Sequence, residues 1–161
     1  GTVTVSMDAN VLGLGSMISG ATTDLLAGDN AAKVIVRVLE SKGFGCISSG
    51  STDQGFYLSA ISRSGIGRTE HIPEALKDEI DDHGITWQGS RDEPERSMNS
   101  LGEKDYTQGS GWIILVDGRF ISESASAVDL HDGSIVKVRY TLAYGMDIGG
   151  TYQGSTFSKT Y

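Results

Sequence analysis

The stretch GWIILVDG, residues 111–118, decides the fold class of this chain. Successive side chains of a strand point to opposite faces, so a continuous apolar run covers both faces and is typical of an interior strand. Asp-Gly directly after the run supplies the positive φ that a tight turn requires. We therefore expect Trp112 to anchor the core rather than to stack on a ligand. The apolar run consists of Trp112, Ile113, Ile114, Leu115 and Val116.

Two further segments have the alternation of half-buried strands. Residues 2–7 alternate polar and apolar side chains, and glycine-rich residues 10–18 predict a turn and a second strand, so the chain should start with a hairpin. Residues 135–144 follow a second Asp-Gly pair, with one face expected to be wet. Its apolar face carries Val136, Val138, Tyr140, Leu142 and Tyr144, and its wet face carries Lys137, Arg139 and Thr141.

Residues 27–45, AGDNAAKVIVRVLESKGFG, predict the main helix. Asp29 or Asn30 can accept from the open amides of the first turn, and Gly43 can end the helix in a left-handed conformation. An apolar stripe at helical spacing indicates packing on a sheet. The stripe consists of Ala31, Val34, Ile35, Val38 and Leu39.

A second helix is predicted between Pro73 and Gly84, with a narrow apolar stripe of Ile72, Leu76 and Ile80. Residues 85–108 are polar and are expected to be irregular. We therefore predict a single α+β domain over residues 1–161. Its β-grasp-like mixed sheet of about four or five strands packs on one main amphipathic helix, and a helical and loop insertion spans about residues 65–108.

Composition excludes several classes of partner. The 161 residues carry a net charge of −8, without a run of basic residues, which argues against nucleic acid and against anionic membranes. No apolar stretch approaches the length of a membrane span, so we expect no membrane insertion of this segment. The single cysteine, Cys46, leaves stability to packing.

The motifs of catalysis and metal binding are incomplete. The glycine-rich stretches GLGS, residues 13–16, and GFGCISSG, residues 43–50, do not complete a phosphate-binding loop. The sequence also has no nucleophile elbow, no zinc cluster and no EF-hand spacing. Cys46 could pair with His71, His83 or His131, and the acidic segments could hold a structural calcium ion, but no local pattern supports either. We therefore predict no catalytic residue, no metal site and no cofactor, and not an enzyme.

Aromatic side chains are the remaining candidates for a binding site, because they can line a groove for a sugar, peptide or cofactor. Tyr144 and Tyr152 lie near the C-terminal end of the sequence, and Trp87 lies in the predicted insertion. These three exposed aromatics are the tentative ligand-binding residues.

The final third resembles the transcobalamin-like C-terminal domain family. The resemblance rests on Gly111-Trp112, Val116-Asp117-Gly118, Leu130-His131-Asp132-Gly133 and Tyr140-Thr141, and it extends upstream through residues 28–43, 53–61 and 72–80. Asp117 stands where the family usually has Asn, and Ser134 replaces the second Asp of an Asp-Gly-Asp turn. The resemblance implies a β-grasp-like fold, and a bacterial cell-surface or secreted protein whose signal and anchor segments lie outside this sequence.

Three functions remain open from the sequence. The leading hypothesis is a non-catalytic extracellular module for adhesion, ligand capture or spacing, whose partner is an extracellular ligand or a neighbouring domain of the same chain. The alternative is a small-molecule binding domain, with a corrinoid among its possible ligands, because the resemblance implies a distant relation to the domain that closes over cobalamin in vertebrate carriers. Fold similarity alone does not carry that function. The third is a cryptic hydrolase.

Overall fold

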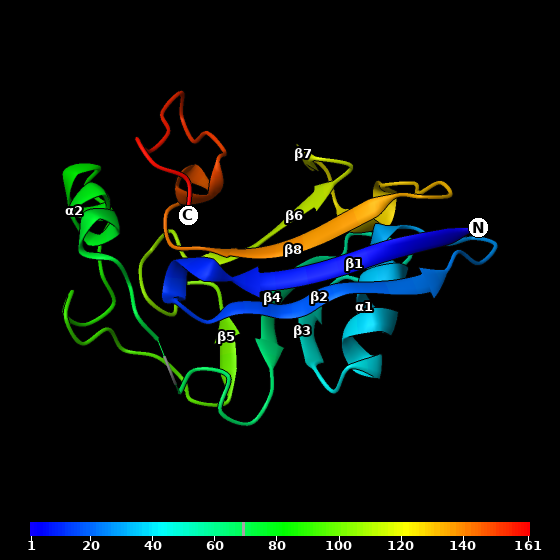
Figure 1. Ribbon diagram of the computed structural model, residues 1–161, viewed down its shortest axis with the longest axis horizontal. Helices are drawn as coiled ribbons and strands as arrows, with labels where there is room; N and C mark the ends of the chain where they lie inside the picture. The colour runs from blue at the N-terminus through cyan, green and yellow to red at the C-terminus, as the bar shows by residue number, and fades with distance from the viewer. Residues whose placement is uncertain (69) are drawn as a thin grey trace.

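The computed structural model describes residues 1–68 and 70–161, and it contains a mixed five-stranded sheet in the order β2-β1-β8-β6-β7 (Figure 1). β1 and β8 run parallel at its centre, and the other neighbours are antiparallel. The α+β mixed-sheet fold predicted from the sequence is confirmed. The strands are β1 (Thr2–Ala9), β2 (Gly15–Asp24), β6 (Gly111–Val116), β7 (Arg119–Phe120) and β8 (Ile135–Thr141).

The predicted N-terminal hairpin and main helix are present. β1 and β2 pair across a short 3-10 helix, η1 (Asn10–Leu12), and α1 (Ala31–Ser41) follows. The side chain of Asn30 caps α1 by accepting from the amide of Lys33 at 2.9 Å. Gly43 has a φ of 85°, the left-handed conformation that ends the helix. The whole predicted apolar stripe of α1 is buried in the core.

A second, three-stranded sheet was not predicted. Its strands are β3 (Gly45–Ser49), β4 (Tyr57–Ser62) and β5 (Ser100–Gly102), in that order. The expectation that residues 85–108 are irregular is therefore wrong at its C-terminal end. Two buried side chains of the larger sheet fix β5: the Trp112 indole donates to the Leu101 carbonyl at 2.7 Å, and the Tyr140 hydroxyl donates to the Gly102 carbonyl at 2.7 Å.

The second helix, α2 (Glu74–Asp82), lies at the opposite side of the molecule from α1 (Figure 1). Leu76 and Ile80 bury its predicted apolar stripe, and Gly84 ends it with a φ of 69°. The C-terminal segment runs next to α2, where the Ser158 amide donates to a Glu79 carboxylate oxygen at 3.0 Å. Thr69, within the predicted insertion, lies outside the described residues.

Residues 111–118 form a strand and a turn as predicted, whereas the prediction for Thr141 of β8 is wrong. β6 lies between β8 and β7, Trp112 is buried, and Asp117 (φ 51°) and Gly118 (φ 81°) form the turn. In β8, however, Thr141 does not belong to a wet face. It is only 1 % exposed, because its side chain is enclosed by a turn that contains the 3-10 helix η3 (Met146–Ile148).

Candidate functional site

Two of the three predicted site residues meet in one pocket. The rings of Tyr144 and Tyr152 stack with centroids 4.1 Å apart and an interplanar angle of 11°. They line a pocket of about 450 Å³ between the end of α2 and the turns after β8. We call it the tyrosine pocket. Its other lining side chains include His83, Thr86, Gln108, Met146, Gln153 and Ser155.

The backbone of the tyrosine pocket is strained. Tyr144 has a φ of 54° and Gln153 a φ of 50°, although neither is a glycine. A side chain in this conformation costs about 1–3 kcal/mol and persists only where its surroundings fix it. Only two other non-glycine residues in the described ranges have a positive φ, namely Lys104 and the turn residue Asp117. Half of these residues therefore line one pocket.

A buried polar cluster holds the turn that carries Tyr144. The Thr141 hydroxyl donates to the Asp147 carboxylate and accepts from the amides of Ala143 (3.1 Å) and Gly145 (2.8 Å). The amide of Leu142 donates to the other oxygen of Asp147 at 2.8 Å. Burial raises the pKa of Asp147, while the bonds from Thr141 and Leu142 act in the opposite direction. Each polar group of this cluster is thus paired, and the turn is fixed from beneath.

The loop before β6 also supports this turn. The Thr107 hydroxyl donates to the Leu142 carbonyl at 2.6 Å, and the Tyr144 amide donates to the Gly109 carbonyl at 3.0 Å. A Cβ added at Gly109 would lie 2.9 Å from the Tyr144 ring, so this close approach requires glycine. The position of Tyr144 is therefore determined from two separate segments of the chain.

The lining of the tyrosine pocket consists of polar and aromatic side chains without a full charge, together with the imidazole of His83. It contains hydroxyl and amide groups, two phenol rings and a methionine, with no Asp, Glu, Lys or Arg side chain. The His83 ring packs against Phe157 with centroids 4.7 Å apart, and its Nδ1 lies 3.0 Å from the Glu79 carbonyl. A pocket of this composition favours an uncharged ligand that presents an apolar face and hydrogen-bonding groups.

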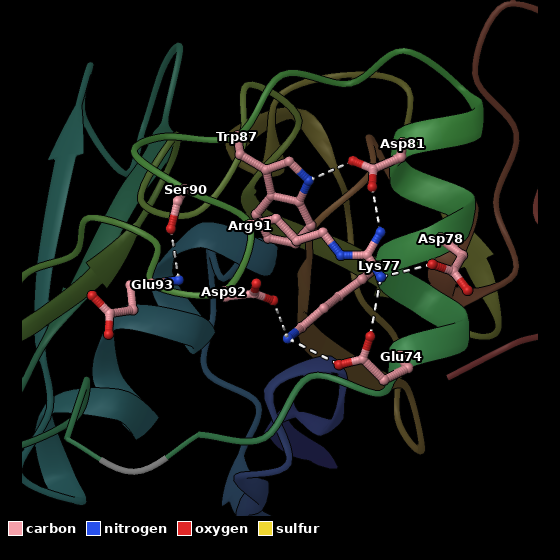
Figure 2. A network of polar contacts seen from close by, with 9 residues as sticks. All are labelled: Glu74, Lys77, Asp78, Asp81, Trp87, Ser90, Arg91, Asp92 and Glu93. Atoms are coloured by element: carbon pink, nitrogen blue, oxygen red, sulfur yellow. Dashed lines mark hydrogen bonds and ion pairs between the residues drawn. The ribbon is translucent and has the colours of Figure 1, made fainter.

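The third predicted site residue, Trp87, does not join the tyrosine pocket. Its indole donates to Asp81 of α2 at 2.9 Å, beside the guanidinium of Arg91 (Figure 2). Arg91 also bonds Asp81, and it reaches Asp78 at 2.6 Å and Glu74 at 3.1 Å. This network fastens the loop after α2 to the helix, so Trp87 has a structural partner.

The candidate nucleophile has the wrong electrostatics for catalysis. Burial raises the pKa of the Cys46 thiol to about 11, so the thiol is protonated at neutral pH, whereas nucleophilic cysteines have a lowered pKa. His131 lies instead on an exposed turn, with its Nε2 3.1 Å from Asp117. Over the described ranges, no group of three His, Cys, Asp or Glu side chains is placed to hold a metal ion, and no helix is long and apolar enough to cross a bilayer.

Sequence reasoning named the two tyrosines but missed what holds them. Asp147 gives no signal as a lone acidic residue in MDIGG, and Thr141 was assigned to the wet face by alternation. No local sequence pattern marks the positive φ of Tyr144, since only the following Gly145 is a typical turn residue.

Comparison with known proteins adds no family. No protein-family profile matches the chain, and no curated protein matches it. The resemblance to the transcobalamin-like domain therefore stays a prediction from motifs.

Proposed function

We propose that this chain is a non-catalytic binding module of a bacterial surface or secreted protein, and that it captures an uncharged ligand in the tyrosine pocket. The observation that carries the proposal is the conformation of Tyr144. The chain keeps a large aromatic side chain at a left-handed position and supports it with the Thr141–Asp147 cluster. Such strain at a pocket is typical of a functional site.

The chemistry of the pocket selects the ligand class. Tyr152 is 38 % exposed, so a phenol face is open to an apolar ring surface, while Gln108, Gln153 and Ser155 offer amide and hydroxyl groups. A neutral, hydroxyl-bearing ring such as a sugar satisfies both requirements. A corrinoid macrocycle is too large to be enclosed in a pocket of about 450 Å³.

Calorimetry with a panel of neutral mono- and disaccharides, together with cobalamin and cobinamide, tests the ligand class. We expect heat from at least one saccharide and none from the corrinoids. The Tyr152→Ala variant should lose that binding by tenfold or more. Tyr57→Ala is the matched control, because Tyr57 is also an exposed tyrosine and lies outside the tyrosine pocket.

Two results would overturn ligand capture at this pocket. One is the absence of heat from the whole panel at millimolar ligand. The other is an equal loss of binding in the two tyrosine variants. Proteolytic shaving of intact source cells, followed by mass spectrometry of the released peptides, separately tests the surface location, and recovery of peptides only after lysis would contradict it.

A further inference from the structure

The edge of β6 opens onto a second cavity, which shares only Gln108 and Tyr144 with the lining of the tyrosine pocket. β7 pairs with β6 only at Leu115 and Val116, and the next residue, Ile121, makes the last bond by donating to the Ile114 carbonyl at 3.1 Å. The chain then turns away into residues 122–125. Across residues 1–68 and 70–161, no strand pairs with the remainder of this edge.

The direction of the free backbone groups follows from the ladder. In an antiparallel pair, alternate residues direct both N–H and C=O to one neighbour or to the other. The Asp117 amide donates toward β8, to the Ile135 carbonyl, and the Ile114 carbonyl accepts from the β7 side. Trp112 is two residues before Ile114, so its N–H and C=O also point away from β8, to the side where no described strand is paired with it.

The cavity follows this edge. One part, of about 470 Å³, lies against Trp112, Ile113 and Ile114, and an adjoining part, of about 340 Å³, continues past Trp112 to Ser110. Neighbouring residues of a strand face opposite sides, so a cavity lined by three consecutive residues lies at the strand edge rather than on one face. Both parts share Tyr57, which is 53 % exposed. We call the two parts together the edge groove.

The walls of the edge groove suit an extended peptide. Phe56, Tyr57 and Ile121 provide apolar surface along it. Glu123 lies at one end, and in the described part of the chain its carboxylate forms no ion pair. At the other end, Glu103 accepts from the Tyr57 hydroxyl at 2.6 Å and lies next to Lys104. An added strand gains main-chain hydrogen bonds from the edge and specificity from side-chain pockets.

We propose that the edge groove binds a short extended peptide by strand addition to β6. The peptide pairs with the N–H and C=O of Trp112, places apolar side chains at alternate positions against Tyr57 and Ile121, and carries a basic residue toward Glu123. The long edge of β2 lacks these features, because its ladder with β1 is interrupted by two register shifts and it has a polar sequence. The proposal does not depend on ligand capture in the tyrosine pocket.

Selection from a random linear heptapeptide library tests the groove without a known partner. The protein serves as bait, and the Ile121→Lys variant serves in counter-selection, because a lysine there puts a charge in the apolar wall. Ile135→Lys is the matched control. Ile135 is 47 % exposed on β8 and does not line the groove, so this variant should retain the selected peptides. Circular dichroism confirms that both variants fold.

The selected peptide is then synthesised with and without N-methylation at alternate backbone positions. We expect N-methylation to weaken binding by at least tenfold, and amide NMR shifts to gather at Trp112, Ile114 and Tyr57. The proposal is overturned if no peptide is enriched over the counter-selection, if N-methylation leaves affinity unchanged, or if the shifts centre on His83 and Tyr152, which line the tyrosine pocket but not the groove. The last outcome would assign peptide binding to the tyrosine pocket.

Discussion

Replacing Thr141 by valine tests whether the buried cluster holds the turn of the tyrosine pocket. Valine has nearly the same shape, so the change removes the hydroxyl without opening a cavity. Three interactions disappear: the bond to Asp147 and the bonds from the amides of Ala143 and Gly145. Thr141 is 1 % exposed, so water does not readily replace them.

The magnitude follows from the groups left unpaired. A buried donor or acceptor without a partner costs about 1–3 kcal/mol. Three such groups at the low end of that range give a loss of about 3 kcal/mol in the free energy of unfolding. For a chain of this length, that corresponds to a fall in Tm of about 6–12 °C. At a slope of about 2 kcal/mol per molar, the urea midpoint falls by about 1.5 M.

The loss should also depend on pH. The bond from Thr141 favours the charged form of Asp147, so its removal raises the folded pKa of Asp147 further above the ordinary value. A folded pKa above the unfolded one means that unfolding is favoured as pH rises between the two values. The Thr141→Val loss should therefore be smaller at about pH 4 than at about pH 7.

Urea denaturation followed by tryptophan fluorescence measures both effects. Thr22→Val is the matched control, since Thr22 is exposed on β2, and a surface change of this kind stays within about 0.5 kcal/mol. A loss below about 1 kcal/mol for Thr141→Val, or one equal to that of the control, would refute the reasoning.

Three other outcomes are expected elsewhere in the molecule. Asn30→Ala should lower the free energy of unfolding by about 1 kcal/mol or more, because it removes both the helix cap and the side-chain amide that donates to the Thr52 carbonyl, whereas Asn30→Ser, which keeps a cap acceptor, should lose less in the same denaturation assay. Cys46, with a pKa of about 11, should react with iodoacetamide near pH 8 at least tenfold more slowly than free cysteine, and an equal rate would contradict its burial. The pKa of His131 is raised first by its bond to the Asp132 carbonyl and then by Asp117, so its stabilising contribution is present at acidic pH and is lost as pH rises through the folded pKa. NMR titration should show this pKa falling in Asp117→Asn, and an unchanged value would refute the contact.

The sequence predicted those elements whose periodicity is long enough to be seen. The helical stripe of α1 spans three turns, and β6 and β8 have six and seven residues. β5 has only three residues, and its partner β4 lies far away in the sequence, so no local pattern marks it. β5 is placed by its pairing with β4 and by the two bonds from Trp112 and Tyr140 of the larger sheet.

The sequence predicted two residues of the candidate site, but it did not predict how their side chains are arranged. Tyr144 and Tyr152 stood out as aromatics near the C-terminal end. Their stacking depends on the left-handed backbone of Tyr144, which local propensity disfavours and the Thr141–Asp147 cluster enforces. Trp87 was also selected as an aromatic residue, but it does not line the tyrosine pocket, and its indole donates to Asp81 instead.

The central parallel pair has a consequence for folding kinetics. Thr4 of β1 pairs with Ile135 of β8, so the middle of the sheet joins segments from opposite ends of the described chain. Closing so long a loop is entropically costly and slows folding relative to a helical bundle. A chain emerging from the ribosome cannot form this pair until β8 has been synthesised, and until then the first hairpin can pack on α1 but lacks its central neighbour in the sheet. A truncation that removes β8 should therefore abolish folding rather than weaken it.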